Sequence, residues 1–149
     1  MRLIKYDTID SLTKNGRVEL GEIQDQNVGL DIKELPADFD LWIDEKIPGP
    51  VQKEKEDDAI FKCRISRWRR IQNVAMIYES AVEGEMAFDK KKDEFDTLTG
   101  FYEYVFQELL DYGFSIAQFM KAVQQVMLFN DMTEKAVKEA QKDFLPETA

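Results

Sequence analysis

One stretch of the sequence decides the fold: residues 58–87, which read DAIFKCRISRWRRIQNVAMIYESAVEGEMA. Its apolar side chains recur at steps of three and four residues. They are Phe61, Ile65, Trp68, Ile71, Ala75, Tyr78 and Val82. At about 100° per residue they cover an arc of roughly 140°, which is typical of an amphipathic helix with one face against a core. The pattern predicts a helix from Asp58 to about Ala87, with Trp68 buried on its apolar face.

Three further helices are predicted downstream. The first runs over 97–112 and ends at Gly113, a residue suited to the position after a helix C-terminus. Ser115 and Thr133 are well placed to cap the second and third helices, because their hydroxyls can accept from the first backbone N–H groups. We therefore expect a bundle of about four helices over 58–145, followed by a short tail, 146–149.

The chain ahead of the bundle reads differently. Residues 17–23 and 28–33 alternate polar with apolar side chains around a polar turn at 24–27, which predicts two strands. The dipeptide Asn15-Gly16 favours a further hairpin turn, and residues 1–6 could supply a third strand. A short helix is predicted after Pro36, with Phe39, Leu41, Trp42, Ile43 and Ile47 on its apolar side.

These elements predict an α+β chain that is mainly α. A small β-containing region over 1–47, comprising a hairpin or meander and a short helix, precedes the helical bundle. The charged stretch 48–57, which opens with Pro48-Gly49-Pro50, is the predicted linker between the two parts.

Composition excludes several classes of activity. The 149 residues include 30 acids and 20 bases, for a formal charge of −10, and no histidine. Without an imidazole there is no Ser-His-Asp or Cys-His catalysis, and the single Cys63 forms no internal disulfide. No apolar run approaches the roughly 20 residues that span a bilayer, and the charged N-terminus does not resemble a signal peptide. We expect a cytoplasmic protein without membrane contacts.

The basic residues are concentrated in one segment. Residues 60–78 hold five bases and no acid, and four of these bases form the predicted basic patch: Lys62, Arg67, Arg69 and Arg70. With Trp68 they could grip a phosphate backbone and stack a base. However, the surrounding negative charge repels nucleic acid. We expect no direct nucleic-acid binding, and cations that pair with the chain's own acids or with an acidic partner.

One carboxylate pair suggests an enzyme. Glu108 and Asp111 lie at i, i+3, a spacing that resembles the magnesium-binding half-motif of all-α nucleotide pyrophosphohydrolases. The nearest second half-motif is Asp93-Glu-Phe-Asp96, and Glu79 or Glu83 could add ligands. A metal-dependent nucleotide hydrolase is therefore one alternative. A solvated helix face explains the same pair more simply, and no phosphate-binding glycine loop is present, so no cofactor or metal is expected.

The favoured hypothesis is a non-enzymatic protein whose acidic surface binds, and inhibits, a basic nucleic-acid-binding partner. Acids on a rigid frame can imitate the spaced charge of a nucleic acid. The predicted partner-binding acids are Asp38, Asp40, Asp44, Glu45, Glu79, Glu83, Glu85, Asp89, Asp93, Glu94 and Asp96. Tyr102 and Tyr104 are the predicted aromatic anchors, because the rings of this helix fall on more than one side.

Small size, strong acidity and the lack of a catalytic base are similar in profile to phage-encoded inhibitors of host nucleases, including some anti-CRISPR proteins. A third possibility is an assembly subunit whose helices complete a bundle in a homodimer.

Overall fold

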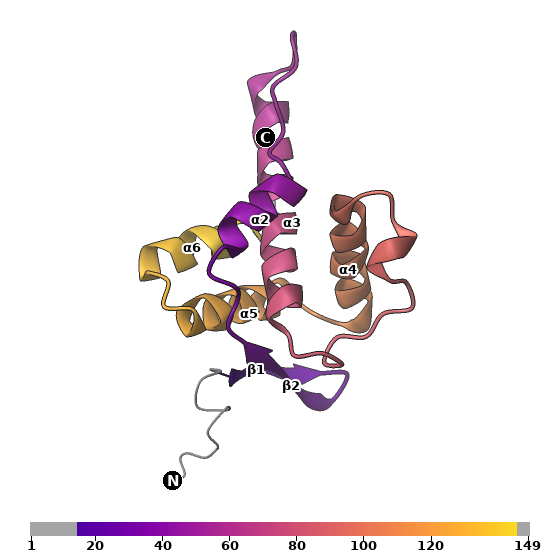
Figure 1. Ribbon diagram of the computed structural model, residues 1–149, viewed down its shortest axis with the longest axis vertical. Helices are drawn as coiled ribbons and strands as arrows, with labels where there is room; N and C mark the ends of the chain where they lie inside the picture. Colours follow the sequence, from indigo (N-terminus) through magenta and orange to yellow (C-terminus); the bar gives the residue numbers. More distant parts are fainter. Residues whose placement is uncertain (1–14, 146–149) are drawn as a thin grey trace.

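The computed structural model describes residues 15–145 and is mainly helical, with one antiparallel hairpin ahead of the helices (Figure 1). This confirms the predicted fold class, including four α-helices after residue 58. The elements are β1 (Asn15–Ile23), β2 (Gln26–Lys33), α2 (Phe39–Lys46), α3 (Asp58–Ser80), the 3-10 turn η1 (Lys92–Glu94), α4 (Leu98–Tyr112), α5 (Ile116–Phe129) and α6 (Glu134–Lys142).

The hairpin turns at Gln24-Asp25, where both residues have positive φ (54° and 63°). This matches the predicted polar turn. The prediction of a turn at Asn15-Gly16 is wrong, since both residues lie in β1 and pair with β2. Gly16 serves packing instead: a Cβ there would lie 2.7 Å from the Phe129 ring of α5. The third strand predicted over residues 1–6 falls outside the described residues.

Helix α3 begins as predicted and ends early. The Asp57 side chain caps it by accepting from the Ala59 N–H at 2.8 Å. The predicted extension to Ala87 is wrong, because α3 stops at Ser80. There Ala81 bridges to Ile32, and the Val82 N–H donates to the Asp31 carbonyl at 2.8 Å. The helix therefore ends where the backbone pairs with the open edge of β2.

The remaining helices begin where the capping residues indicate. Thr97, Ser115 and Thr133 each accept a backbone N–H at the start of α4, α5 and α6. Gly113 follows α4 with φ 121°, a conformation that favours glycine. The segment 88–96, predicted as either more helix or a charged connection, is a connection that contains η1.

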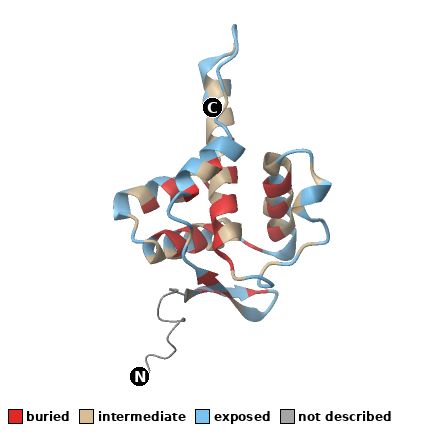
Figure 2. Cartoon of the chain, in the orientation of Figure 1, coloured by how far each residue is buried: buried red, intermediate tan, exposed pale blue. Residues whose placement is uncertain are grey.

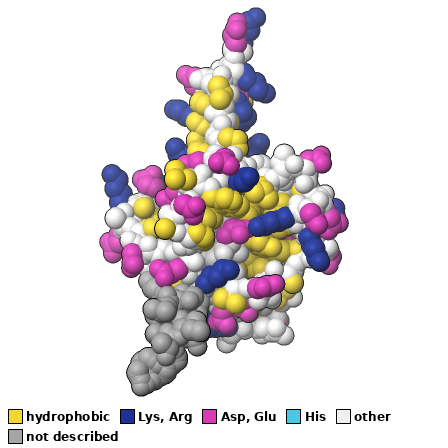
Figure 3. Space-filling model, in the orientation of Figure 1, with side chains coloured by type: hydrophobic (Ala, Val, Ile, Leu, Met, Phe, Trp, Pro, Cys, Tyr) yellow, Lys and Arg dark blue, Asp and Glu magenta, His cyan; other side chains and the backbone are white. Residues whose placement is uncertain are grey.

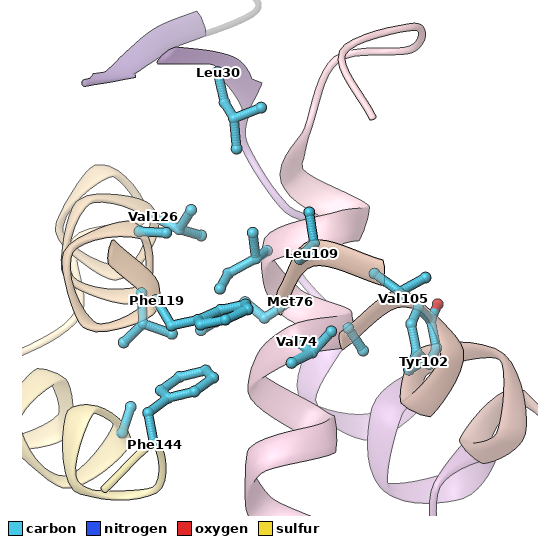
Figure 4. Packing of buried hydrophobic residues seen from close by; sticks show 14 of the residues in the cluster. Leu30, Val74, Met76, Tyr102, Val105, Leu109, Phe119, Val126 and Phe144 are labelled. Atoms are coloured by element: carbon cyan, nitrogen blue, oxygen red, sulfur yellow. The ribbon is translucent and has the colours of Figure 1, made fainter. Parts of the chain in front are cut away.

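The core forms where the C-terminal half of α3 passes between α4 and the α5–α6 pair (Figure 1). Side chains from α3, α4, α5, α6 and β2 converge there (Figure 4). The rings of Phe119 and Phe144 stack at 5.3 Å in its centre. Buried residues of the hairpin and α2 belong to the same cluster. The division into separate 1–47 and 58–145 units, joined by a linker, stays a prediction.

The N-terminal half of α3 projects from this body, and the segment 48–57 runs beside it (Figure 1). We call residues 48–70 the arm. No residue of the arm is buried, as the lack of red in this part of Figure 2 shows. Trp68 is half-buried rather than buried as predicted. It lies at the base of the arm, where its Nε1–H donates to the Ile47 carbonyl at 2.7 Å.

Helix α2 packs on α3 as an amphipathic helix. Phe39, Ile43 and Ile47 are buried as predicted, whereas Leu41 is 77% exposed. Leu41 lies two residues from both Phe39 and Ile43, so the helical geometry turns it away from the face that they share.

Candidate functional site

The acids of α2 lie at the surface. Asp38, Asp40, Asp44 and Glu45 are all exposed, as the acidic-face hypothesis requires. Asp44 accepts a hydrogen bond from Gln72 Nε2 at 3.0 Å, which leaves its charge in place. The first turn of α2 carries Asp40 at the positive end of the helix dipole.

A second group of acids lies on the connection between α3 and α4. Glu83, Glu85, Asp89, Asp93, Glu94 and Asp96 are exposed there. Glu94 also accepts from the Lys91 N–H at 2.8 Å, which holds the η1 turn. Glu85 accepts from the Asp31 N–H at 2.8 Å and so ties the connection to β2.

Glu79 differs from the other predicted acids. It is half-buried, and its Oε2 accepts from Lys92 Nζ at 2.6 Å and from the Tyr102 hydroxyl at 2.5 Å. The Lys92 ammonium also lies 5.4 Å from the centre of the Tyr78 ring. The Glu79 charge is therefore compensated within the fold. The prediction that Glu79 belongs to a free acidic face is wrong. Its bonds to Lys92 and Tyr102 instead hold the connection against α3 and α4.

The predicted aromatic anchors are engaged inside the molecule. Tyr102 is fully buried, and burial beside the Glu79 carboxylate raises the pKa of its hydroxyl far above the ordinary value. Tyr104 is half-buried; its hydroxyl accepts from the Lys90 N–H at 3.1 Å, and its ring packs on Phe95. The prediction that Tyr102 is an exposed anchor for a partner is wrong, because α4 is covered on two sides and Tyr102 is buried.

The structure brings a third acid, Glu85, to the pair formed by Glu108 and Asp111. Glu85, Glu108 and Asp111 line a pocket of about 550 Å³ between the hairpin and α4. Apolar side chains complete its wall: Val28, Leu30, Met86, Ala87, Phe88, Leu109 and Phe114. The i, i+3 spacing identified two of these carboxylates. The third arrives only because the chain leaves α3 at Ser80 and follows the edge of β2, which no local pattern indicates.

The carboxylates do not gather into a metal centre. Within residues 15–145 no group of three or more Asp, Glu, Cys or His side chains could hold a metal ion. Glu79, a ligand in the hydrolase alternative, is held by Lys92 and Tyr102 instead. The arrangement around Glu108 and Asp111 is therefore an acidic rim on an apolar pocket.

The predicted basic patch divides into separate parts. Lys62, Arg67 and Arg69 are exposed on α3. Arg70 is half-buried, with its Nε donating to the Asp143 carbonyl at 3.1 Å and its guanidinium 5.7 Å from the Phe106 ring centre. Figure 3 shows Lys and Arg side chains along the arm, together with Asp and Glu side chains near its tip, and charged side chains of both signs over the body. The basic residues of α3 therefore share the arm with acids, and no part of this face carries charge of a single sign.

Comparison with protein-family models found no match, and searches against curated proteins and solved structures found no significant similarity. Among the described residues, no helix combines the length and apolar character needed to cross a membrane.

Proposed function

We propose that this chain is a non-enzymatic binding protein whose acidic surface recognises a basic, nucleic-acid-binding partner protein. One observation carries the proposal: every predicted partner-binding acid except Glu79 is exposed, on α2 and on the connection between α3 and α4. These carboxylates are held on a packed frame, so their charge is displayed without the entropy cost of ordering a flexible chain.

Such a surface suits a groove built to hold phosphates. Lysine and arginine in a nucleic-acid-binding protein interact with spaced negative charge whatever group carries it. Long-range attraction then accelerates the encounter, and salt weakens it. Binding of this chain would then block the partner's nucleic-acid site and so inhibit the partner.

The pocket between the hairpin and α4 adds a specific anchor. A lysine or arginine side chain has an apolar stem and a charged head. The apolar wall formed by Leu30 and Leu109 can contact the stem, and the carboxylates of Glu108 and Asp111 can pair with the head. The pocket therefore supports recognition of a basic side chain that projects from the partner.

The experiment captures partners on the tagged chain and then measures competition. A captured protein is purified, and its affinity for this chain is measured at several salt concentrations with and without duplex DNA or RNA. We expect one nucleic acid to displace the chain, and affinity to fall as salt rises. A partner that binds the chain and nucleic acid simultaneously would contradict the proposal.

Matched charge reversals locate the surface. The double variant Asp40→Lys/Asp44→Lys changes two exposed acids of α2, and Glu134→Lys/Glu139→Lys changes two exposed acids of α6 by the same net charge. We expect the α2 variant to weaken binding at least about tenfold and the α6 variant to have a small effect. Glu108→Gln/Asp111→Asn tests the pocket in the same assay. If all three variants bind the partner as tightly as the unmodified chain, the acidic surface is not the recognition site.

A further inference from the structure

We infer that the arm is a self-association surface: two copies of the chain pair their arms antiparallel, about a two-fold axis that passes close to residue 62. This inference is independent of the proposed function, which uses acids of the body. It rests on the exposure of the arm, on two apolar side chains that it presents, and on the order of charges along its length.

The arm consists of the start of α3 and the non-helical segment 48–57, and it has an exposed flank. Two of its large apolar side chains are conspicuously exposed, Val51 at 81% and Ile60 at 57%. The Val51 carbonyl accepts from Arg64 Nη2 at 2.9 Å, and Arg64 lies one helical turn after Ile60. Val51 and Ile60 are therefore on the same flank of the arm. Apolar side chains that meet solvent on a projecting helix gain stability when a second surface covers them.

The charges of the arm change sign along its length: acids lie at 54–58, around the start of α3, and the bases Lys62, Arg64, Arg67, Arg69 and Arg70 follow. Asp57 caps the start of α3, and the exposed Arg67 lies seven residues after Ile60, near the base of the arm. Ten residues separate them, or about 15 Å along a helix, with Ile60 in between. An antiparallel second copy places each Asp57 opposite the other copy's Arg67, and each Ile60 opposite the other copy's Val51 and the stem of its Arg64. A parallel arrangement places like charges together, so the charge order selects the antiparallel one.

The Arg64–Glu56 ion pair prepares the flank for this contact. Arg64 Nε lies 2.7 Å from Glu56 Oε2, and the Glu56 side chain is only 9% exposed. The guanidinium is already neutralised, so a second copy would not have to bury an unpaired charge at the centre of the interface. The surface involved is one side of a short helix, which is small for a protein interface. We therefore expect a weak, concentration-dependent dimer.

The mass of the full chain in solution tests the inference. Sedimentation over a range of concentrations should show a shift from 17.4 kDa towards twice that value. Ile60→Asp should weaken the dimer at least about tenfold, since it places a charge in the apolar centre. Leu128→Asp, on α5, is the matched control, because Leu128 is also exposed (45%), and should leave the dimer intact. A mass of one chain at every concentration would overturn the inference.

Charge reversal and cross-linking test the geometry. Arg67→Glu should weaken the dimer, whereas Arg69→Glu, the same change on a different flank of α3, should not. Cys63 is the single cysteine and lies next to the proposed axis, so a short bismaleimide linker should join two copies through it. Moving the thiol to α5, in Cys63→Ser/Ala117→Cys, should abolish the cross-link. A dimer that resists Ile60→Asp, or that does not cross-link through Cys63, would place the interface elsewhere and contradict the antiparallel pairing.

Discussion

The ion pair between Arg64 and Glu56 fastens the segment 48–57 to α3. Glu56 also accepts from the Lys53 N–H at 3.0 Å, and together these bonds lower the pKa of its carboxyl from 4.5 to about 2. A carboxyl whose pKa is lowered by folding stabilises the fold above its unfolded pKa, and the contribution is lost as pH falls through the folded value. The window for this pair therefore lies between about pH 4.5 and 2.

The pH titration of Glu56 is the first prediction. Carbon-detected NMR of the side-chain carboxyl should give a midpoint near 2, and Arg64→Gln should raise the midpoint towards 4.5. The reason is that the guanidinium is the largest cause of the lowered pKa. Arg69→Gln, which removes a cation elsewhere on α3, serves as the control. An unchanged midpoint in Arg64→Gln would show that the pair is not formed in solution.

Gly16 supplies a second prediction at the scale of one residue. Gly16→Ala should lower the free energy of unfolding by about 1–3 kcal/mol, because the new methyl group meets the Phe129 ring. Denaturant unfolding measures the loss. The double variant Gly16→Ala/Phe129→Leu should recover part of it, since the flexible leucine can move aside. If the single variant is as stable as the original chain, β1 does not approach α5 as closely as described.

At the scale of elements, the base of the arm joins three of them. Trp68 on α3 contacts Ile47, at the end of α2, through its indole N–H, and its ring lies against Gly49. Because Trp68 is half-buried, it contributes less than a fully enclosed tryptophan.

Replacing Trp68 tests this junction. Trp68→Ala should lower the free energy of unfolding by about 2 kcal/mol, below the 3–5 kcal/mol typical of large aromatic side chains in a closed core. Trp68→Phe should cost about 1 kcal/mol, mainly through the lost hydrogen bond to the Ile47 carbonyl. Thermal unfolding of the two variants compares them. An unchanged Tm for Trp68→Ala would contradict the packing of segment 48–57 on α3.

At the scale of the whole molecule, acids outnumber bases 30 to 20. The ion pairs of Glu56, Glu79 and Asp31 each use one acid and one base, so they leave this surplus of acids unchanged. Exposed acids repel one another, and this repulsion opposes the compact state.

Salt should therefore stabilise the fold. Raising NaCl from low to physiological ionic strength screens the repulsion over distances of about 10 Å, and we expect Tm to rise by a few degrees, or about 1 kcal/mol. Scanning calorimetry measures the shift. The α2 variant Asp40→Lys/Asp44→Lys has a smaller surplus and should respond less. A Tm that falls with salt would show that attractive ion pairs dominate instead.

The parts of the fold that were predictable depend on neighbours in sequence. Thr97, Ser115 and Thr133 cap their helices because a hydroxyl reaches a backbone N–H within three residues. The positive φ of Gly113 follows from the same local geometry. By contrast, Asn15-Gly16 has the local signature of a turn, and packing against α5 overrides it.

The sequence by itself determined the helical periodicity, the hairpin at 17–33 and the separation of a basic segment from acidic surroundings. Only the tertiary structure decided where α3 ends, that Glu79 pairs with Lys92 and Tyr102, and that Glu85 joins Glu108 and Asp111 around one pocket. The physical reason is the distance along the sequence over which each property is set. Periodicity, caps and charge order are properties of neighbouring residues, whereas burial and the partners of a carboxylate depend on which distant segments the core brings together.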